Sequence, residues 1–151
     1  MQSGRKDARV RVVVDTNTLI SGSLWQGPSA RFLEAAARGK VELVLSPELL
    51  AEFAEVVSRP KFAARVAAGA ATPDDLARKL AEEATIVAPI FLPLPPQLRD
   101  PGDLHVLACA VAAHADAIIS GDADLLTMQS FQGIPIINAS EALRQLGLES
   151  E

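Results

Sequence analysis

Short apolar segments that alternate with helical patterns are the feature that most restricts how this chain folds. Five segments have the Val- and Ile-rich character of strands buried on both faces, and they are residues 10–14, 41–45, 85–87, 117–120 and 134–137. Helical patterns lie at 29–38, after Ser46-Pro47-Glu48, after Thr72-Pro73-Asp74-Asp75, at 104–113 and after Ser140-Glu141. We therefore predict an α/β fold, a three-layer α/β/α sandwich with a central, mostly parallel sheet of five strands.

The composition fits one domain with a substantial core. The chain has 151 residues, of which 49% are hydrophobic and 22% charged, and these values are typical of a single domain. We place the domain at residues 9–147, between a flexible N-terminal tail at 1–8 and a C-terminal tail at 148–151.

Three features lead us to expect a cytoplasmic protein. The N-terminus is polar and lacks the apolar segment of a signal peptide. The most apolar stretch, residues 86–96, is too short to span a membrane and is interrupted by prolines. The single cysteine, Cys109, excludes an internal disulfide and lies among small apolar residues, which favours a buried thiol over a nucleophile.

The charge is distributed unevenly along the chain. The formal net charge of −5 is not the signature of a basic nucleic-acid-binding protein. Residues 1–100 carry 13 Lys/Arg against 12 Asp/Glu, a net +1, whereas residues 101–151 carry one base against seven acids, a net −6. A polyanion would therefore be bound through the first two thirds of the chain. With 4% aromatic residues and no Tyr, a base-stacking platform is poorly supplied.

Two of the predicted strands run directly into carboxylates. Asp15 follows an all-valine stretch, and Asp122 follows the 117–120 segment. Because residues just beyond the carboxyl ends of neighbouring parallel strands converge, we expect the two carboxylates to face each other. Such proximity is unfavourable unless a cation or a proton intervenes. Each acid taken singly has an ordinary alternative role as a turn or helix cap.

Glu52 is the acid of the helix after Ser46 that can face the same crevice. It lies at the border of the apolar stripe of that helix, whereas Glu48 and Glu55 point towards water. A solvated position on the helix surface is the alternative for Glu52.

The segment before the 104–113 helix supplies further acids. We expect one of Asp100 and Asp103 to cap this helix and the other to project from its first turn. Asp124 follows Asp122 by two residues. Acids from separate strand ends and helix starts are the ligands that Mg²⁺ and Mn²⁺ prefer, and zinc-ligand spacing is absent.

Four ordered blocks of sequence resemble the PIN-domain proteins, and within them the group described as toxin components of toxin–antitoxin systems. The blocks are Val-Val-Asp-Thr-Asn (13–17) with Leu-Ile-Ser-Gly and Leu-Trp (19–25), Ser-Pro-Glu-Leu-Leu-Ala-Glu-Phe (46–53) with Ser-Arg-Pro-Lys-Phe (58–62), Arg-Asp-Pro-Gly-Asp (99–103), and Ser-Gly-Asp-Ala-Asp-Leu-Leu (120–126). The resemblance covers residues 9–146. One departure is Leu104, where related proteins often place Asn after the motif acid.

This resemblance implies a ribonuclease that depends on Mg²⁺ or Mn²⁺ and leaves 5′-phosphate and 3′-hydroxyl ends. The implied catalytic and metal-binding acids are Asp15, Glu52, Asp103 and Asp122, with Asp124 as an accessory carboxylate, Asn17 and Ser120 behind them, and Asp100 shaping the loop. An ion held by three of these acids would activate a water, and a second ion would stabilise the leaving oxygen. Related proteins commonly form homodimers and bind a small antitoxin.

Substrate contacts are less well defined by the sequence. The cationic candidates for RNA phosphates are Arg59, Lys61, Arg65 and Arg99, together with Arg11 and Arg31, and a solvated surface position is the ordinary alternative for each. Trp25 lies in a predicted loop, where it can stack on a base, contact a second subunit or cover the core.

Two other functions remain compatible with parts of the pattern. A haloacid-dehalogenase-like phosphatase would use Asp15 as nucleophile and an acid two positions later, but Asn17 stands there and cannot donate and recover the proton. A PIN-like scaffold that binds RNA or protein without cutting fits the negative charge and Leu104. The presence of all four acids, Asp15, Glu52, Asp103 and Asp122, argues against this reading.

Overall fold

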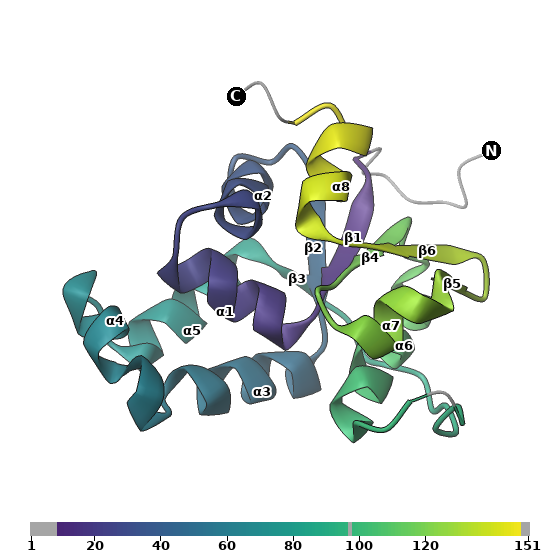
Figure 1. The fold of residues 1–151 in the computed structure, drawn as a ribbon, viewed down its shortest axis with the longest axis horizontal. Coiled ribbons are helices and arrows are strands. Elements are labelled where there is room, and N and C mark those ends of the chain that lie inside the picture. Colours follow the sequence, from purple (N-terminus) through teal and green to yellow (C-terminus); the bar gives the residue numbers. More distant parts are fainter. Residues whose placement is uncertain (1–8, 97, 149–151) are drawn as a thin grey trace.

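The chain folds into a six-stranded sheet flanked by helices (Figure 1), which confirms the predicted fold class. The computed structural model describes residues 9–96 and 98–148, so the predicted tail at 1–8 and the last three residues lie outside the described residues. The elements in chain order are β1 (Arg11–Val14), α1 (Thr16–Leu24), α2 (Pro28–Ala37), β2 (Glu42–Leu45), α3 (Pro47–Val57), the 3₁₀ helix η1 (Pro60–Phe62), α4 (Ala63–Ala68), α5 (Pro73–Glu83), β3 (Thr85–Ile86), α6 (Pro101–Ala113), β4 (Ala117–Ile119), α7 (Ala123–Met128), β5 (Ser130–Phe131), β6 (Ile134–Ile137) and α8 (Ala139–Gln145).

The strands lie in the order β3-β2-β1-β4-β6-β5, and only the β5–β6 pair is antiparallel. The edge strand β5 is the sixth strand that the sequence did not reveal. It has two residues and is joined to β6 by Gln132 and Gly133, which have φ angles of 49° and 83°. Positive φ at both central residues matches the twist of a two-residue hairpin. A pattern of alternation cannot be recognised in a strand this short.

Two short helices follow the strands that end in aspartate. Asp15 caps α1, because its Oδ1 accepts a hydrogen bond from the Thr18 N–H, and Asp122 caps α7 through the Leu125 N–H. Both aspartates therefore cap helices, which is the alternative role that the sequence offered for each. Capping does not exclude a site, because each carboxylate has a second oxygen.

The core is built around the three central strands. Val12, Val13 and Val14 are completely buried, and burial of each such side chain stabilises the fold by roughly 1.5–3 kcal/mol. Helix α6 packs on β1, β2 and β4, whereas α2 packs against both α1 and α8 in a separate helical layer. Cys109 is buried, as predicted. Leu148, which we assigned to the C-terminal tail, also belongs to the core, and its N–H donates to the Leu143 carbonyl.

The order of the strands fixes where a site can form. The chain leaves β1 towards β2 on one side of it and later returns to β4 on the other side. In open α/β sheets, a crevice forms beyond the carboxyl ends of the strands at such a change of direction. The carboxyl ends of β1 and β4 carry Asp15 and Ser120.

Candidate metal centre

Asp15 and Ser120 meet at the carboxyl ends of adjacent strands. Val14 pairs with Ile119 in the parallel register of β1 and β4, so the residue that follows each lies beside the other. The Ser120 hydroxyl donates to Oδ2 of Asp15 over 2.5 Å and accepts a hydrogen bond from the Asp122 N–H over 2.9 Å. One buried hydroxyl therefore connects the two strand-end acids.

Asp103 projects from the first turn of α6 towards these acids, and Asp100 caps that helix by accepting a hydrogen bond from the Gly102 N–H. The Asp103 side chain is buried, and its Oδ2 has no hydrogen-bond partner among the described residues. Burial, followed by the negative charge of Asp122, raises the pKa of Asp103 to about 7. A buried carboxylate oxygen without a donor is costly, so this position favours a proton or a cation.

Asp124 completes an acidic cluster with Asp103 and Asp122. One carboxylate oxygen from each of the three lies within 4.8 Å of the others. Both oxygens of Asp124 also accept hydrogen bonds from the Arg99 guanidinium, at 3.0 and 3.2 Å. The hydrogen bond from Arg99 holds the pKa of Asp124 below its ordinary value. Asp124 is therefore already partly neutralised, whereas Asp103 is not.

Glu52 enters the same pocket from α3. It is half-buried, whereas Glu48 and Glu55 are exposed, as predicted from the helical pattern. Its carboxylate lies against the start of α6, because a Cβ added to Gly102 would stand 3.0 Å from Glu52 Oε2. Glycine at position 102 thus leaves room for the Glu52 carboxylate beside the start of α6.

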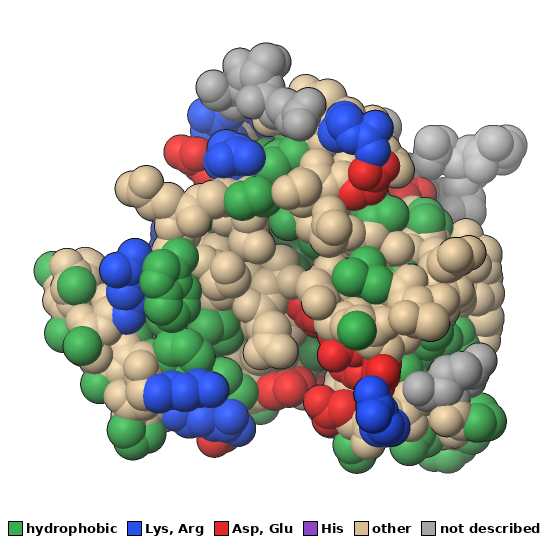
Figure 2. All heavy atoms as spheres, in the orientation of Figure 1, with side chains coloured by type: hydrophobic (Ala, Val, Ile, Leu, Met, Phe, Trp, Pro, Cys, Tyr) green, Lys and Arg blue, Asp and Glu red, His purple; other side chains and the backbone are tan. Residues whose placement is uncertain are grey.

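Five of these acids line one pocket of about 330 Å³, whereas Asp124 lies outside its lining. The lining residues are Asp15, Thr16, Asn17, Glu52, Val56, Arg59, Lys61, Phe62, Asp100, Gly102, Asp103, Val106 and Asp122. Figure 2 shows acidic side chains gathered on this face between α3 and α7, with cationic side chains on either side. A larger cavity of about 590 Å³ lies between α2 and α5 and is not lined by any of the predicted acids.

The donor set fits a hard divalent cation. Asp103 offers an oxygen without a partner, Asp122 and Asp124 lie beside it, and Asp15 is attached through Ser120. Carboxylate oxygens without cysteine or histidine are the ligands that Mg²⁺ and Mn²⁺ prefer. Asn17 is exposed and lines the pocket.

Only some of the Arg and Lys residues that were candidates for binding RNA phosphates lie at the pocket. Arg59 lines the pocket and forms a bidentate pair with Glu55 on α3, at 2.8 and 3.2 Å. Lys61 also lines the pocket. Arg65 lies further along α4, where it contacts Trp25. Arg99 is the partner of Asp124 and does not line the pocket.

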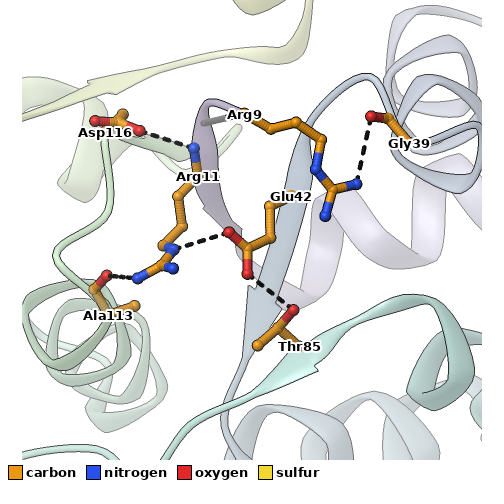
Figure 3. Close-up of polar contacts among 7 residues, drawn as sticks. All are labelled: Arg9, Arg11, Gly39, Glu42, Thr85, Ala113 and Asp116. Carbon is orange, nitrogen blue, oxygen red and sulfur yellow. Dashed lines mark hydrogen bonds and ion pairs between the residues drawn. The ribbon is translucent and has the colours of Figure 1, made fainter. Parts of the chain in front are cut away.

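Arg11 is a phosphate candidate that the structure places elsewhere. It begins β1, whose other end carries Asp15, and its guanidinium donates to Glu42 Oε1 at 3.0 Å and to the Ala113 carbonyl at 2.7 Å. Figure 3 shows Glu42 between Arg11 and the hydroxyl of Thr85, which donates to Oε2 at 3.0 Å. This network joins β1, β2, β3 and α6, so Arg11 has a structural role, and the suggestion that it contacts phosphate was wrong.

Thr16 and Phe62 are site residues that the sequence did not single out. Thr16 is buried with its Oγ1 lacking a partner among the described residues, and Phe62 forms a wall of the pocket. The only feature of the sequence that could have indicated them is that Thr16 follows Asp15 and Phe62 follows Lys61. A side chain next to a functional residue in sequence faces the site only when the backbone turns there, and tertiary packing decides this.

Comparison with known proteins agrees with this geometry. None of the described helices is long and apolar enough to cross a membrane. A search of curated proteins gives no significant match. The PIN domain family matches residues 11–124, which include Asp15, Glu52, Asp103 and both acids after β4. PIN domains are generally nucleases that use divalent metal ions. The chain therefore belongs to the PIN domain family.

Proposed function

We propose that this chain is a divalent-metal-dependent endoribonuclease that cuts RNA to 5′-phosphate and 3′-hydroxyl ends. The observation that supports this proposal most strongly is the buried Asp103 carboxylate, whose Oδ2 lacks a donor beside Asp122. Such an arrangement is unfavourable in the isolated protein and becomes favourable once a cation binds. A fold maintained only for binding a protein partner would have no need of it.

The proposed catalytic acids are Asp15, Glu52, Asp103 and Asp122, with Asp124 as an accessory ligand. Mg²⁺ or Mn²⁺, when bound, supplies activation of a water and stabilisation of charge on the phosphate. Asp15 is held for this task from two sides, because Thr18 N–H binds Oδ1 and Ser120 binds Oδ2. Groups that orient metal-binding carboxylates in this way typically change metal affinity or activity 10–100-fold when removed.

Glu52 and Asn17 complete the proposed site from the helices that form its other walls. Glu52 approaches from α3 and Asn17 from α1, and both line the pocket that Asp103 and Asp122 share. Glu52 would therefore bind a second cation or the water that attacks the phosphate, and Asn17 would donate a hydrogen bond to the substrate.

We also propose that the protein is the toxin of a toxin–antitoxin pair and acts in the cytoplasm as a homodimer. The support is the resemblance of its four sequence blocks to toxin components. A small antitoxin that covers the basic and apolar surface beside the acids would be the partner. Growth arrest on expression of the wild type but not of Asp15→Asn, relieved by a cognate antitoxin, is the expected result.

The nuclease proposal is tested by cleavage of labelled structured and single-stranded RNAs with Mn²⁺, Mg²⁺ or EDTA. We expect metal-dependent cutting by the wild type, and its loss in Asp15→Asn and Glu52→Gln. Glu48→Gln is the matched control, because Glu48 lies on the same helix but is exposed outside the pocket. A melting temperature that rises with Mn²⁺ while no RNA is cut would contradict the nuclease. Loss of both responses would favour a scaffold that binds RNA or protein.

A further inference from the structure

Trp25 is exposed in a way that core packing does not explain. Among the large hydrophobic side chains exposed in residues 9–96 and 98–148, four lie in the segment 86–94, and the fifth is Trp25, which is 42% exposed. It is the only tryptophan of the chain. Trp25 lies just after α1, at its C-cap, and so outside the hydrophobic core that α1 itself covers.

Trp25 forms a small aromatic cluster with Phe62, although the two lie far apart in sequence. Their ring centroids are 6.1 Å apart and the rings are nearly perpendicular, at 72°. Arg65 lies over the Trp25 ring at 5.1 Å, and Lys61 lies over the Phe62 ring at 5.2 Å. The Arg65 Nε also donates to the Leu24 carbonyl at 2.8 Å, which fixes the guanidinium beside the indole. We call these four side chains the aromatic platform.

The aromatic platform is continuous with the acidic pocket. Phe62 and Lys61 line the pocket that holds Asp15, Glu52 and Asp103. Trp25 and Arg65 line the neighbouring hollow, of about 440 Å³. A polymer that crosses the acids would therefore meet Phe62 first and Trp25 next. Figure 2 shows hydrophobic and cationic surface next to the acids, on the side of α3 and α4.

The cations of the aromatic platform are not neutralised by neighbouring acids. Residues 58–73 contain Arg59, Lys61 and Arg65 and no Asp or Glu, in a chain of net charge −5. In the described part of the chain, neither Lys61 nor Arg65 has an acidic partner within ion-pair distance, whereas Arg59 is paired with Glu55. Cations next to exposed aromatic rings suit a ligand that has both anionic groups and flat faces.

We propose that the aromatic platform binds single-stranded RNA, with a base stacked on Trp25 and flanking phosphates bound by Lys61 and Arg65. This inference rests on the proposed function, because it leads the strand into the acidic pocket. Stacking requires a base that is not already inside a duplex, so paired RNA is a poor ligand. The low aromatic content suggested that such a surface was poorly supplied, but the fold concentrates two of the few aromatic residues beside the acids.

The sole tryptophan makes the proposal directly measurable. The full chain is titrated with short single-stranded RNA in EDTA, so that no cutting occurs, and Trp25 fluorescence is followed together with the anisotropy of labelled RNA. We expect quenching by single-stranded RNA and little by a duplex of the same sequence. Trp25→Leu should weaken binding about tenfold, and Trp25→Phe should largely restore it, because one stacked base contributes on that scale.

The cations have their own readout and control. The Lys61→Ala, Arg65→Ala double variant should reduce the slope of log affinity against log salt by about 1.4, since two phosphate contacts are lost from a single strand. Phe91→Ala is the control, because Phe91 is 91% exposed and lines neither the acidic pocket nor the hollow beside Trp25. It should bind like the wild type.

The two proposals fail differently in these measurements. Quenching by RNA in EDTA without any metal-dependent cutting would retain the platform and remove the nuclease. Cutting that persists with unchanged RNA affinity in Trp25→Leu, and no quenching in the wild type, would overturn the platform and leave its surface to a protein partner. Equal quenching by single-stranded and duplex RNA would also overturn the proposal.

Discussion

The hydroxyl of Ser120 donates a 2.5 Å hydrogen bond to Oδ2 of Asp15, and the two residues lie 105 positions apart in the sequence. The same hydroxyl accepts the N–H of Asp122. The parallel register of β1 and β4 brings the strand ends together, and the Ser120 side chain, 1% exposed, fixes the orientation of both acids. The site is thus prearranged by the sheet before any ligand binds.

Replacement of Ser120 by alanine should impair the site more than the fold. Oδ2 of Asp15 would lose its donor in a buried position, which costs about 1–3 kcal/mol of stability. Mn²⁺ affinity should fall 10–100-fold, because the ligand is no longer oriented. Urea unfolding and calorimetric Mn²⁺ titration measure the two effects. Ser58→Ala, which removes an exposed hydroxyl that donates to the Glu55 carbonyl, should change neither. Unchanged Mn²⁺ affinity in Ser120→Ala would refute the orienting role.

The metal-free protein should lose stability as pH rises through neutrality. Burial raises the pKa of Asp103 from 3.8 to about 7, so the folded state holds this proton more tightly than the unfolded state does. The resulting stabilisation is present below about pH 4 and is lost as pH increases through 7. Asp103→Asn removes this dependence. In EDTA it should match the wild type near pH 4 and exceed it at pH 8, by on the order of 2–4 kcal/mol.

Urea unfolding between pH 4 and pH 8.5 tests this prediction. With Mn²⁺ present the order at pH 8 should reverse, because only the wild type keeps the ligand. The contrary result is a constant difference in the free energy of unfolding between the two proteins across this pH range in EDTA. It would show that ionisation of Asp103 does not destabilise the folded state.

The Arg11–Glu42 pair should matter for stability and not for metal binding. Glu42 is 7% exposed and holds both Arg11 and Thr85 (Figure 3). Removing one partner of a buried ion pair leaves the other charge uncompensated, so Glu42→Ala should lose about 3–5 kcal/mol. Glu48→Ala, at an exposed position in the first turn of α3, should lose only about 0.3–1 kcal/mol. Thermal and urea unfolding measure both variants, and a loss of Mn²⁺ affinity in folded Glu42→Ala would be the contrary result.

Arg99→Gln should strengthen Mn²⁺ binding severalfold. Arg99 holds both carboxylate oxygens of Asp124 and adds a positive charge beside the acidic cluster. Its removal frees Asp124 as a ligand and lowers the repulsion of the incoming cation. The Arg99 side chain is 86% exposed, so loss of the pair should have little effect on folding. Arg78→Gln, which breaks the exposed pair with Asp75 on α5, serves as the control. Weaker binding in Arg99→Gln would mean that Arg99 holds Asp124 in the geometry the metal requires.

Local sequence determined the frame of this protein. The Val-rich runs and the start signals at Ser46 and Thr72 predicted strands and helices correctly, because strand burial and helix capping depend on residues within one or two turns. The position of Asp15 and Asp122 at strand ends follows from the same local pattern. Helix α1 was missed, since its Thr-, Ser- and Gly-containing sequence has a weak helical propensity and is stabilised by packing.

Tertiary structure alone decided which side chains meet. The sequence placed Asp103, Asp124 and Arg99 near the site, but it did not show that Asp124 is paired with Arg99 while Asp103 Oδ2 is left without a donor. It placed Trp25 and Phe62 in separate blocks, whereas the fold brings their rings into contact. The physical reason is that pairing and burial depend on the register of strands and the approach of helices, which join residues far apart in the chain.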